Sequence, residues 1–271
     1  MIDNITFKKV RKLIYDEVGI NLTEVKKALV SSRLRKRMNV LNIPEYKDYI
    51  HFVKNDKSKK EIVQLFNIIS TNVTHFFREK DHFDFFEKVF LQSKKEGRDR
   101  FRIWSAACSS GEEPYSIAMT LEELLQGERY DYKILGTDIS TKVLNMSLQG
   151  IYQEKQMQTV SSKLKLNYFT KYTDDKDLTL YQIDDRIKRR VLFKRLNLSK
   201  PPFPLKGNLD AIFCRNVMIY FDDIVRTRLV QEFYRLLRPG GFLFIGHSES
   251  LAGLQNIDFK LIKASIYKKE L

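Results

Sequence analysis

The chain has 271 residues, 43% of them hydrophobic, and a formal net charge of +14, so it is long enough for one large or two small domains with a buried core. Its two cysteines, Cys108 and Cys214, exclude a disulfide framework, and the lack of any apolar run of about 18 residues excludes a transmembrane helix. The amino-terminal residues lack the charged-then-apolar pattern of a signal peptide, so we expect a soluble, cytoplasmic protein without membrane insertion.

Apolar residues at helical spacing predict a small helical domain in the first 70 residues. The expected helices cover residues 5–18, 23–39, 44–53 and 62–69. Gly19 ends the first helix, Thr23 can cap the second, and Pro44 suits the first turn of the third.

The second expected helix carries a basic stripe. Lys26, Arg33 and Arg37 are separated by seven and four residues and so share a helical face. Residues 1–60 contain 15 Lys and Arg against 7 Asp and Glu, which is +8 of the total +14. This asymmetry indicates either a surface for an anionic partner or a solvated face that keeps the protein soluble.

The segment after the fourth helix predicts a bend. Asn72 and Thr74 are poor helix formers, so their side chains are free to form hydrogen bonds with a ligand. His75 and His82 have no second ligand at metal spacing, so we expect ordinary surface or packing histidines and no metal site. An apolar stripe follows and predicts a core-facing helix that ends near Gly97: Phe83, Phe86 and Phe90.

The pattern of residues 101–125 predicts a buried strand, a tight turn at Gly111 and an apolar helix. In open α/β sheets a ligand binds at such a turn, because backbone N–H groups and the positive end of the helix dipole meet there. Glu112 and Glu113 both lie in the first helical turn, where the dipole alone favours a negative charge. The residues themselves leave open which of the two contacts a ligand.

The next apolar strand, residues 132–138, ends at Asp138. A carboxylate at this place can accept both hydroxyls of a ribose, but it can also be the N-cap of the helix that starts near Ser140. Residues 209–221 predict a third strand, with Asn216 and Val217 at its carboxyl end. Tyr220 follows closely and either presents its hydroxyl at this edge or packs beneath the next helix.

The regular alternation of strands and helices lapses between residues 150 and 190. Alternating apolar and polar residues around a turn at 173–175 predict an antiparallel hairpin, and a further strand ends at Asn197 and Leu198. The RPGG segment, residues 238–241, predicts the end of a helix before a fourth parallel strand. Strands that alternate with helices in this way predict a parallel sheet.

Several motifs together carry a resemblance to a known family. They are STNVTHFFRE (70–79), SSGEEPYSIA (109–118), GTDIS (136–140), FCRNVMIYF (213–221) and GHSES (246–250). In this order they resemble the CheR family of chemoreceptor glutamate methyltransferases, within the class I S-adenosylmethionine-dependent methyltransferases. The resemblance covers nearly the whole chain.

The resemblance implies an α/β fold: a small all-helical N-terminal domain, then a doubly wound, Rossmann-like methyltransferase domain with an inserted antiparallel β-subdomain. The expected divisions are 1–71 for the helical domain, 72–97 for the linker and first catalytic helix, 98–271 for the methyltransferase domain, and about 162–195 for the β-subdomain.

The resemblance also implies S-adenosylmethionine as cofactor. Asn72 and Thr74 would lie at its polar edge, and Arg78 would pair with its carboxylate unless it pairs with a surface acid such as Glu79. The family pattern favours Glu113 over Glu112, with either the amino group or the ribose as its target. The full set of implied cofactor residues is Asn72, Thr74, Arg78, Glu113, Asp138, Asn197, Leu198, Asn216 and Val217, with Tyr220 nearest the reaction.

The implied substrates are glutamates on the methylation helices of chemoreceptors, which would meet the stripe of Lys26, Arg33 and Arg37. We expect a monomer that does not bind nucleic acid. Family members that dock a receptor tail carry glycines in the hairpin loop, and the loop at 171–177 has none, which speaks against tail docking. The alternatives are a methyltransferase for nucleic acid or small molecules, and a non-catalytic module that senses S-adenosylmethionine.

Overall fold

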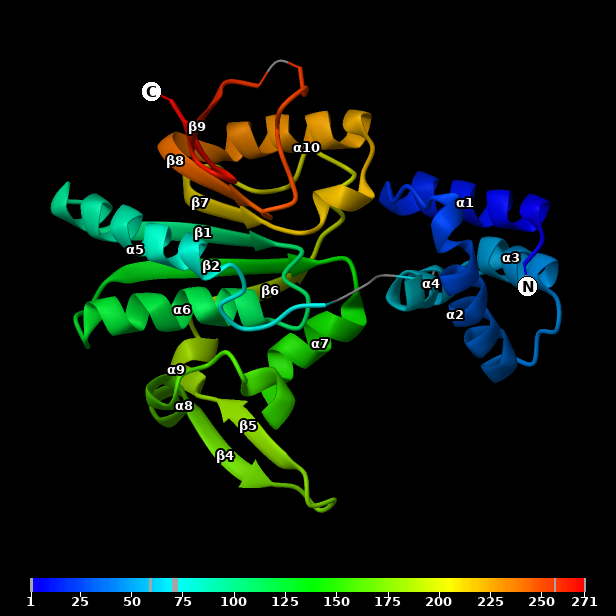
Figure 1. Cartoon of the computed structure of the whole chain (residues 1–271), viewed down its shortest axis with the longest axis horizontal. Helices are drawn as coiled ribbons and strands as arrows, with labels where there is room; N and C mark the ends of the chain where they lie inside the picture. The colour runs from blue at the N-terminus through cyan, green and yellow to red at the C-terminus, as the bar shows by residue number, and fades with distance from the viewer. Residues whose placement is uncertain (1, 59, 70–72, 256, 271) are drawn as a thin grey trace.

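The computed structural model describes residues 2–58, 60–69, 73–255 and 257–270. The helical unit consists of α1 (Asn4–Val18), α2 (Lys27–Val40), α3 (Tyr46–Asn55) and α4 (Lys60–Ile69), shown in blue in Figure 1. The other helices are α5 (Lys80–Lys95), α6 (Glu112–Leu125), α7 (Thr141–Gln149), α8 (Ser162–Tyr168), α9 (Asp185–Lys188) and α10 (Asp223–Leu236). The strands are β1 (Arg100–Ala106), β2 (Asp131–Asp138), β3 (Ile151–Gln153), β4 (Phe169–Thr173), β5 (Thr179–Ile183), β6 (Val191–Arg195), β7 (Leu209–Cys214), β8 (Leu237–Ile245), β9 (Phe259–Lys263) and β10 (Ile266–Lys269). No helix among the described residues is long and apolar enough to cross a membrane.

The helical unit forms where the apolar periodicity predicts it, but one helix start differs. Gly19 adopts a left-handed conformation with φ 70° and donates its N–H to the carbonyl of Tyr15, which ends α1 as predicted. Thr23 does not cap α2: its side chain makes no capping hydrogen bond, and a 3₁₀ turn at Glu24–Lys26 comes before the helix.

The second unit is built on a seven-stranded sheet with the order β6-β2-β1-β7-β8-β10-β9. The first five strands run parallel, and β10 and β9 close the sheet with antiparallel pairs. Because the parallel strands run the same way, β1, β2 and β7 end at one edge of the sheet, the edge nearest the helical unit in Figure 1. This arrangement confirms the predicted α/β class with a small helical unit ahead of it.

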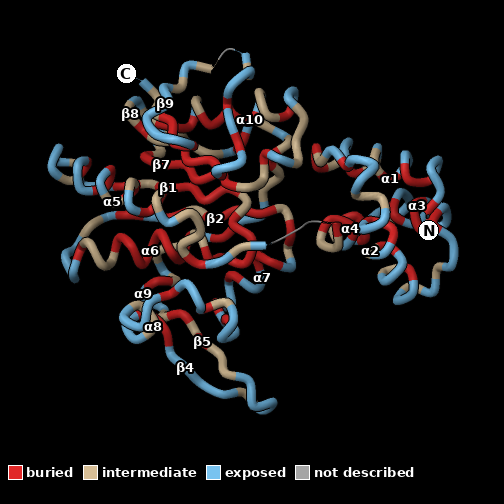
Figure 2. Tube along the Cα trace, viewed as in Figure 1, coloured by how far each residue is buried: buried red, intermediate tan, exposed pale blue. Residues whose placement is uncertain are grey.

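Alternate residues of the central strands pack on opposite faces of the sheet. Phe101 and Ile103 of β1 lie in one core with α5 and α6, whereas Trp104 and Ala106 lie in another core with α10. The helical unit has its own core. The buried central strands are red in Figure 2, while β4 is largely exposed. The site edge is therefore held by a sheet covered on both faces.

The antiparallel part of the structure differs in extent from the prediction. It is a three-stranded sheet with the order β3-β5-β4, so it begins before residue 162 with β3. Its predicted end near residue 195 is wrong, because β6 pairs in parallel with β2 in the main sheet. Alternation alone cannot distinguish these cases, since β6 is an edge strand with one partner and carries exposed residues like those of a hairpin.

The RPGG segment is not a helix stop. The helix α10 ends earlier, at Leu236, and Arg238–Gly241 lies within β8. Gly240 has a φ of 75°, so this glycine supplies an irregular start of the strand instead of a helix end.

The two units touch through the segment that follows α1. Ile20 forms an isolated antiparallel bridge with Phe221, and the N–H of Asn21 donates to the carbonyl of Tyr220 at 2.8 Å. These backbone contacts place the helical unit against the carboxyl edge of the sheet.

Candidate active site

A pocket lies where the helical unit meets the carboxyl edge of the sheet, directly after β1, β2 and β7. It is lined by the following predicted site residues: Thr74, Arg78, Glu113, Asp138, Asn197, Leu198, Asn216, Val217 and Tyr220. Asn72 lies outside the described residues. Segments that are far apart in the sequence are thus brought to one pocket.

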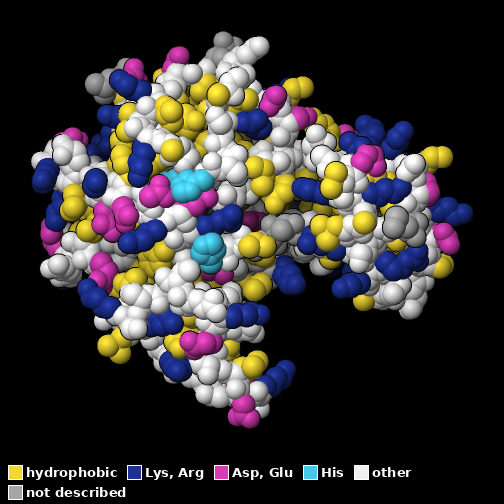
Figure 3. All heavy atoms as spheres, viewed as in Figure 1, with side chains coloured by type: hydrophobic (Ala, Val, Ile, Leu, Met, Phe, Trp, Pro, Cys, Tyr) yellow, Lys and Arg dark blue, Asp and Glu magenta, His cyan; other side chains and the backbone are white. Residues whose placement is uncertain are grey.

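The helical unit supplies one wall of this pocket. Val18, Leu22, Lys26, Leu29 and Arg33 all line it. In Figure 3 hydrophobic side chains gather where the two units join. The sequence predicted a partner-binding role for this unit and did not indicate a role in the pocket itself.

The carboxylate of Asp138 is fixed by the backbone on both sides. One oxygen accepts the N–H of Ser109 at 3.0 Å, and the other accepts the N–H of Ser140 at 2.9 Å. The N-cap of α7 is Ser140, whose hydroxyl accepts from the N–H of Val143, so Asp138 is not that cap. Burial raises the pKa of Asp138. The carboxylate therefore has a set orientation at the pocket.

The structure brings Glu113 and not Glu112 to the pocket. Glu113 accepts from the hydroxyl of Ser105 at 2.6 Å and pairs with Arg215 at 3.0 Å. Glu112 is buried elsewhere, accepts from the amide of Gln156 at 3.1 Å, and has a pKa raised by burial. Of the two acidic residues in this helical turn, only Glu113 can meet a ligand in the pocket.

Arg215 is a central residue of the site that sequence reasoning missed. Its side chain is only 2% exposed and links Glu113 to Glu79, which it contacts at 2.9 Å. Burial opposes ionisation of Glu79, but the charge and hydrogen bonds of Arg215 outweigh it and lower the pKa of Glu79. The signal was present, because an arginine that ends an apolar strand is rarely buried without partners.

Arg78 is not paired with Glu79, the alternative that the sequence left open. It donates to the carbonyl of Val73 at 3.0 Å, while the carboxylate of Glu79 is engaged by Arg215. Arg78 lies on the pocket wall, where its guanidinium can meet an anionic group.

The loop after β7 is held in an unusual conformation. Asn216 has a φ of 59°, its N–H donates to Glu249 at 2.9 Å, and its side-chain amide donates to Glu79 at 3.3 Å. A Cβ atom on Gly246 would lie 2.5 Å from that amide nitrogen, so only glycine fits there. The GHSE segment at the end of β8 thereby fixes the position of Asn216.

Asn197 has a structural task in addition to facing the pocket. Its side-chain amide donates to the carbonyl of Glu17 at 2.8 Å, which ties the strand-end loop to the helical unit, and its oxygen accepts from Ser199. Leu198, directly after it, is buried and apolar.

Tyr220 is half-buried on the pocket wall and not packed within a core. The ammonium group of Lys26 lies 4.5 Å from the centre of its ring, close enough for a cation–π contact. Burial lowers the pKa of Lys26. A cation from the helical unit and a phenol from the unit built on the seven-stranded sheet thus face the same space.

The basic stripe on α2 is turned toward the protein. Arg33 donates to the carbonyl of Ile69 at 2.8 Å, and Arg37 forms two hydrogen bonds with the carboxylate of Glu61, at 3.0 and 2.6 Å. Together with Lys26 in the pocket, these residues do not form the free basic surface that the sequence predicts. Arg33 and Arg37 lie on α2 and are occupied by acceptors that helical periodicity cannot reveal, whereas Lys26 lies in the 3₁₀ turn before the helix.

Two family models match this chain. The CheR methyltransferase SAM binding domain matches residues 72–268, and the CheR methyltransferase all-alpha domain matches residues 5–70.

Individual proteins are also similar. The chemotaxis protein methyltransferase of Borreliella burgdorferi is 42% identical over 265 residues, which cover 95% of this chain and 92% of that protein. The protein of the same name from Klebsiella aerogenes is 36% identical, covering 96% of this chain and 88% of its own. Among solved structures, PKMT2 from Rickettsia typhi in complex with AdoHcy overlaps 54% of this chain and 20% of its own, with 18% identity and a TM-score of 0.32.

Proposed function

We propose that this chain, which belongs to the CheR methyltransferase family, transfers methyl groups from S-adenosylmethionine to glutamate side chains of chemoreceptors. The observation that carries the proposal is the single pocket in which the family's motif residues meet at the carboxyl edge of β1, β2 and β7. The chemotaxis role of similar proteins supports a receptor as the acceptor.

The residues of the pocket fit S-adenosylmethionine, the cofactor of the family. The fixed carboxylate of Asp138 suits the two ribose hydroxyls, and the buried, apolar Leu198 suits the flat face of adenine. Arg78 and Glu113 suit the two charged ends of the amino-acid part. When bound, S-adenosylmethionine supplies a methyl group on a positively charged sulfur.

The acceptor requires no general base. A glutamate carboxylate has an ordinary pKa of about 4.3, so it is ionised at neutral pH. His75 also lines the pocket, and burial, with the nearby Arg78, lowers its pKa, but no proton needs to be removed by it. The task of the protein is to align the carboxylate and to keep water away from it. Positioning of this kind can supply about 7–11 kcal/mol of the barrier.

Tyr220 and Lys26 are the groups that we assign to the acceptor. Their side chains face the same part of the pocket from different units. Lys26 attracts the carboxylate into the pocket, and the Tyr220 hydroxyl orients it. A negative charge is lost as the ester forms, so orientation serves the reaction better than tighter binding of the anion does.

The route for a receptor helix is the hollow between the helical unit and the antiparallel sheet. Figure 3 shows this hollow, with Lys and Arg side chains along its borders. Such charges favour the approach of an acidic helix and make its binding sensitive to salt. Arg35 and Lys36 are exposed on α2 and can contribute to this field.

Incubation with methyl-labelled S-adenosylmethionine tests the proposal. Receptor-bearing membranes, purified RNA and receptor-free membranes are offered in parallel, and the label is scored before and after mild alkali. We expect base-labile label on the receptor alone. Stable label on RNA would favour a nucleic-acid methyltransferase, and cofactor binding without label on any acceptor would favour a sensing module.

A further inference from the structure

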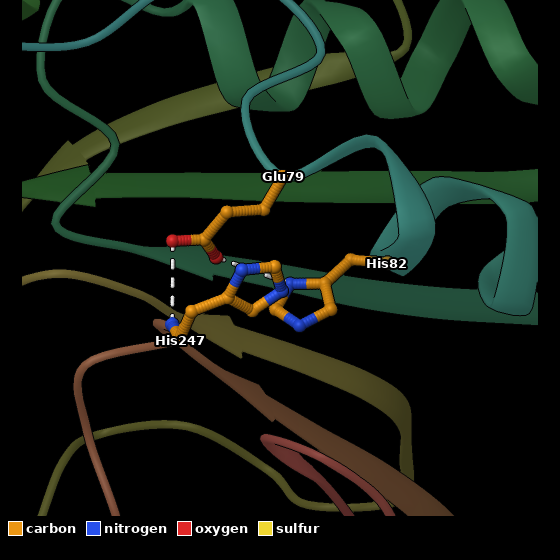
Figure 4. Close-up of side chains that lie close together, drawn as sticks. All are labelled: Glu79, His82 and His247. Atoms are coloured by element: carbon orange, nitrogen blue, oxygen red, sulfur yellow. Dashed lines mark hydrogen bonds and ion pairs between the residues drawn. The ribbon is translucent and has the colours of Figure 1, made fainter.

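Glu79, His82 and His247 form a cluster next to the pocket but outside its lining. Figure 4 shows the three side chains pointing toward one another, Glu79 and His82 from the start of α5 and His247 from the loop after β8. One ligand atom from each lies within 4.8 Å of the others. The sequence spacing offered no second ligand for His82, but the fold brings a histidine that is distant in the sequence close to it.

The hydrogen bonds of His82 determine which of its nitrogens carries a proton. The ring is 0% exposed, and Nε2 lies 2.8 Å from the hydroxyl of Ser265. That hydroxyl donates to the carbonyl of Ala264 at 2.6 Å, so its oxygen accepts from His82, and Nε2 bears the hydrogen. The lone pair of Nδ1 is therefore directed into the cluster.

This lone pair has no suitable neighbour. Nδ1 of His82 is buried without a hydrogen bond and lies 3.4 Å from a carboxylate oxygen of Glu79. Two acceptors at this distance repel each other unless a proton or a cation lies between them.

His247 is oriented in a matching way. Its Nε2 lies 3.0 Å from a carboxylate oxygen of Asp81, to which it can donate. Metal-binding histidines commonly donate one ring nitrogen to a carboxylate or hydroxyl group and offer the other to the metal. Both histidines of the cluster satisfy this condition, His82 through Ser265 and His247 through Asp81.

We propose that Glu79, His82 and His247 bind a divalent first-row transition metal ion, for which Zn²⁺ is the reference case. Two imidazoles and one carboxylate are a donor set that suits zinc, with a fourth position left for water. In a tetrahedral site, ligand atoms about 2.1 Å from the metal lie about 3.4 Å apart, so atoms that are now up to 4.8 Å apart must approach one another by up to about 1.4 Å. His247 can make this movement because its side chain is 47% exposed.

The surrounding charges permit a dication. Glu79 already accepts two N–H groups at each oxygen, from Arg215 at one and from Asn216 and the His247 backbone at the other, so the metal must displace one of these hydrogen bonds. Those of Asn216 and His247 are the longest, at 3.3 Å. The carboxylates of Glu79, Glu113 and Asp81 outnumber the cations Arg215 and Lys263 that contact them. The ion would join the start of α5 to the end of β8 and so stabilise the fold.

The test uses the full chain, freed of metal by a chelator and titrated with Zn²⁺ alone against a chromophoric competitor. His247→Ala should weaken Zn²⁺ binding by about ten- to a hundredfold. His51→Ala is the matched control, because His51 is exposed on α3, and it should bind as the wild type does. The exposed position of His247 keeps its variant folded, which circular dichroism checks.

Melting provides the second readout. Zn²⁺ should raise the melting temperature of the wild type and of His51→Ala but not of His247→Ala, because only a ligand bound to the native state stabilises it. Mg²⁺, which prefers oxygen ligands, should have no such effect. Equal Zn²⁺ affinity for all three proteins, or no binding by the wild type, would overturn the proposal.

Discussion

Asp138 both faces the pocket and connects two backbone segments, so its replacement has two separable effects. Asp138→Ala removes the acceptor of two backbone N–H groups, which should lower the free energy of unfolding by about 1–3 kcal/mol. The loss of charge-assisted hydrogen bonds to ribose should also weaken S-adenosylmethionine binding by about 1.5–3 kcal/mol. Calorimetry below the melting temperature of the variant measures the second effect.

Ser140→Ala provides the control for this prediction. It removes the cap of α7 and should cost about 1 kcal/mol of stability, yet leave cofactor affinity unchanged, because Ser140 does not line the pocket. If both variants bound the cofactor equally well, Asp138 would be a structural residue only.

Arg215 neutralises two carboxylates, so its loss should be costly. Arg215→Met leaves Glu79 and Glu113 close together without a cation and should lower the free energy of unfolding by about 3–5 kcal/mol at pH 7. Arg186→Met, at an exposed ion pair, should cost less than about 1 kcal/mol. Urea denaturation measures both values.

The pH dependence of the Arg215 effect has a defined sign. The folded-state pKa of Glu79 is lowered, so its contribution to stability is present above its ordinary pKa of about 4.3 and is lost as the pH falls through the folded value. In Arg215→Met, burial without the guanidinium raises this pKa, and acid then favours the folded variant. The difference from the wild type should therefore shrink between pH 7 and pH 4, and a constant difference would contradict the assignment.

Tyr220 positions the acceptor in our account. Tyr220→Phe should lower kcat by roughly ten- to a hundredfold with little change in cofactor affinity, because a slightly misplaced acceptor reacts slowly. His75→Gln should retain the wild-type kcat, since no base is needed, and the pH profile of kcat should show no protein ionisation between about pH 6 and 9. Full activity of Tyr220→Phe, or a rate controlled by His75, would contradict this mechanism.

At the scale of elements, α2 is both a wall of the pocket and a partner of α4. Arg37→Glu removes the cation that pairs with Glu61 and places a second carboxylate beside it. The hydroxyl of Tyr49, which donates to Glu61 at 2.8 Å, then remains the neighbour that stabilises the Glu61 carboxylate. We expect a loss of at least about 3 kcal/mol in the free energy of unfolding. Lys36→Glu, at an exposed position on the same helix, should leave stability nearly unchanged.

These two variants distinguish an effect on the stability of the protein from an effect on recognition of the receptor. A lower methylation rate in Arg37→Glu reflects a damaged helical unit, whereas a lower rate in Lys36→Glu at normal stability reflects weaker attraction of the receptor. Thermal melting of both proteins, recorded beside their methylation rates, shows which applies. Unchanged melting of Arg37→Glu would contradict the buried pair with Glu61.

At the scale of elements, the apolar pattern of the sequence predicts helices and strands correctly where the burial of one face is the only cause of the pattern. The helices of the first unit and the strand, turn and helix around Gly111 follow from periodicity that only a buried face explains. The apolar pattern gives a wrong prediction where the conformation of a segment depends on a strand that is distant in the sequence. Arg238–Gly241 lies within β8 as an irregular stretch, because Leu237 before it pairs with β7 and Phe242 after it pairs with β7 and β10. The strand β6 is not part of the hairpin sheet because it pairs in parallel with β2.

The same distinction applies to the site. Asp138 and Asn216 could be predicted because the ends of parallel strands are binding places on general grounds. The sequence could not show that Arg215 pairs with Glu79 or that His82 lies near His247. The members of each pair are far apart in the sequence, and only the fold brings them together. Residue type and order identify the pocket, whereas its electrostatic connections require the fold.

At the scale of the whole molecule, the proposed reaction requires two units to meet at one pocket. The helical unit supplies Lys26 and an apolar wall, and the sheet supplies the fixed polar groups. The backbone bridge between Ile20 and Phe221 and the hydrogen bond from Asn197 to Glu17 hold the units together. In our proposal the acceptor is held by residues of both units, Lys26 and Tyr220, so its alignment with the cofactor depends on this junction.

The most direct test of glutamate methylation is peptide mapping by mass spectrometry. A receptor cytoplasmic fragment is incubated with S-adenosylmethionine and either the wild type or Tyr220→Phe, then digested and analysed before and after mild alkali. We predict one methyl group per modified glutamate, removed by alkali, absent when that glutamate is replaced by alanine, and formed much more slowly by Tyr220→Phe. Methyl groups that resist alkali, or that map to lysine, asparagine or backbone positions, would contradict the proposed function.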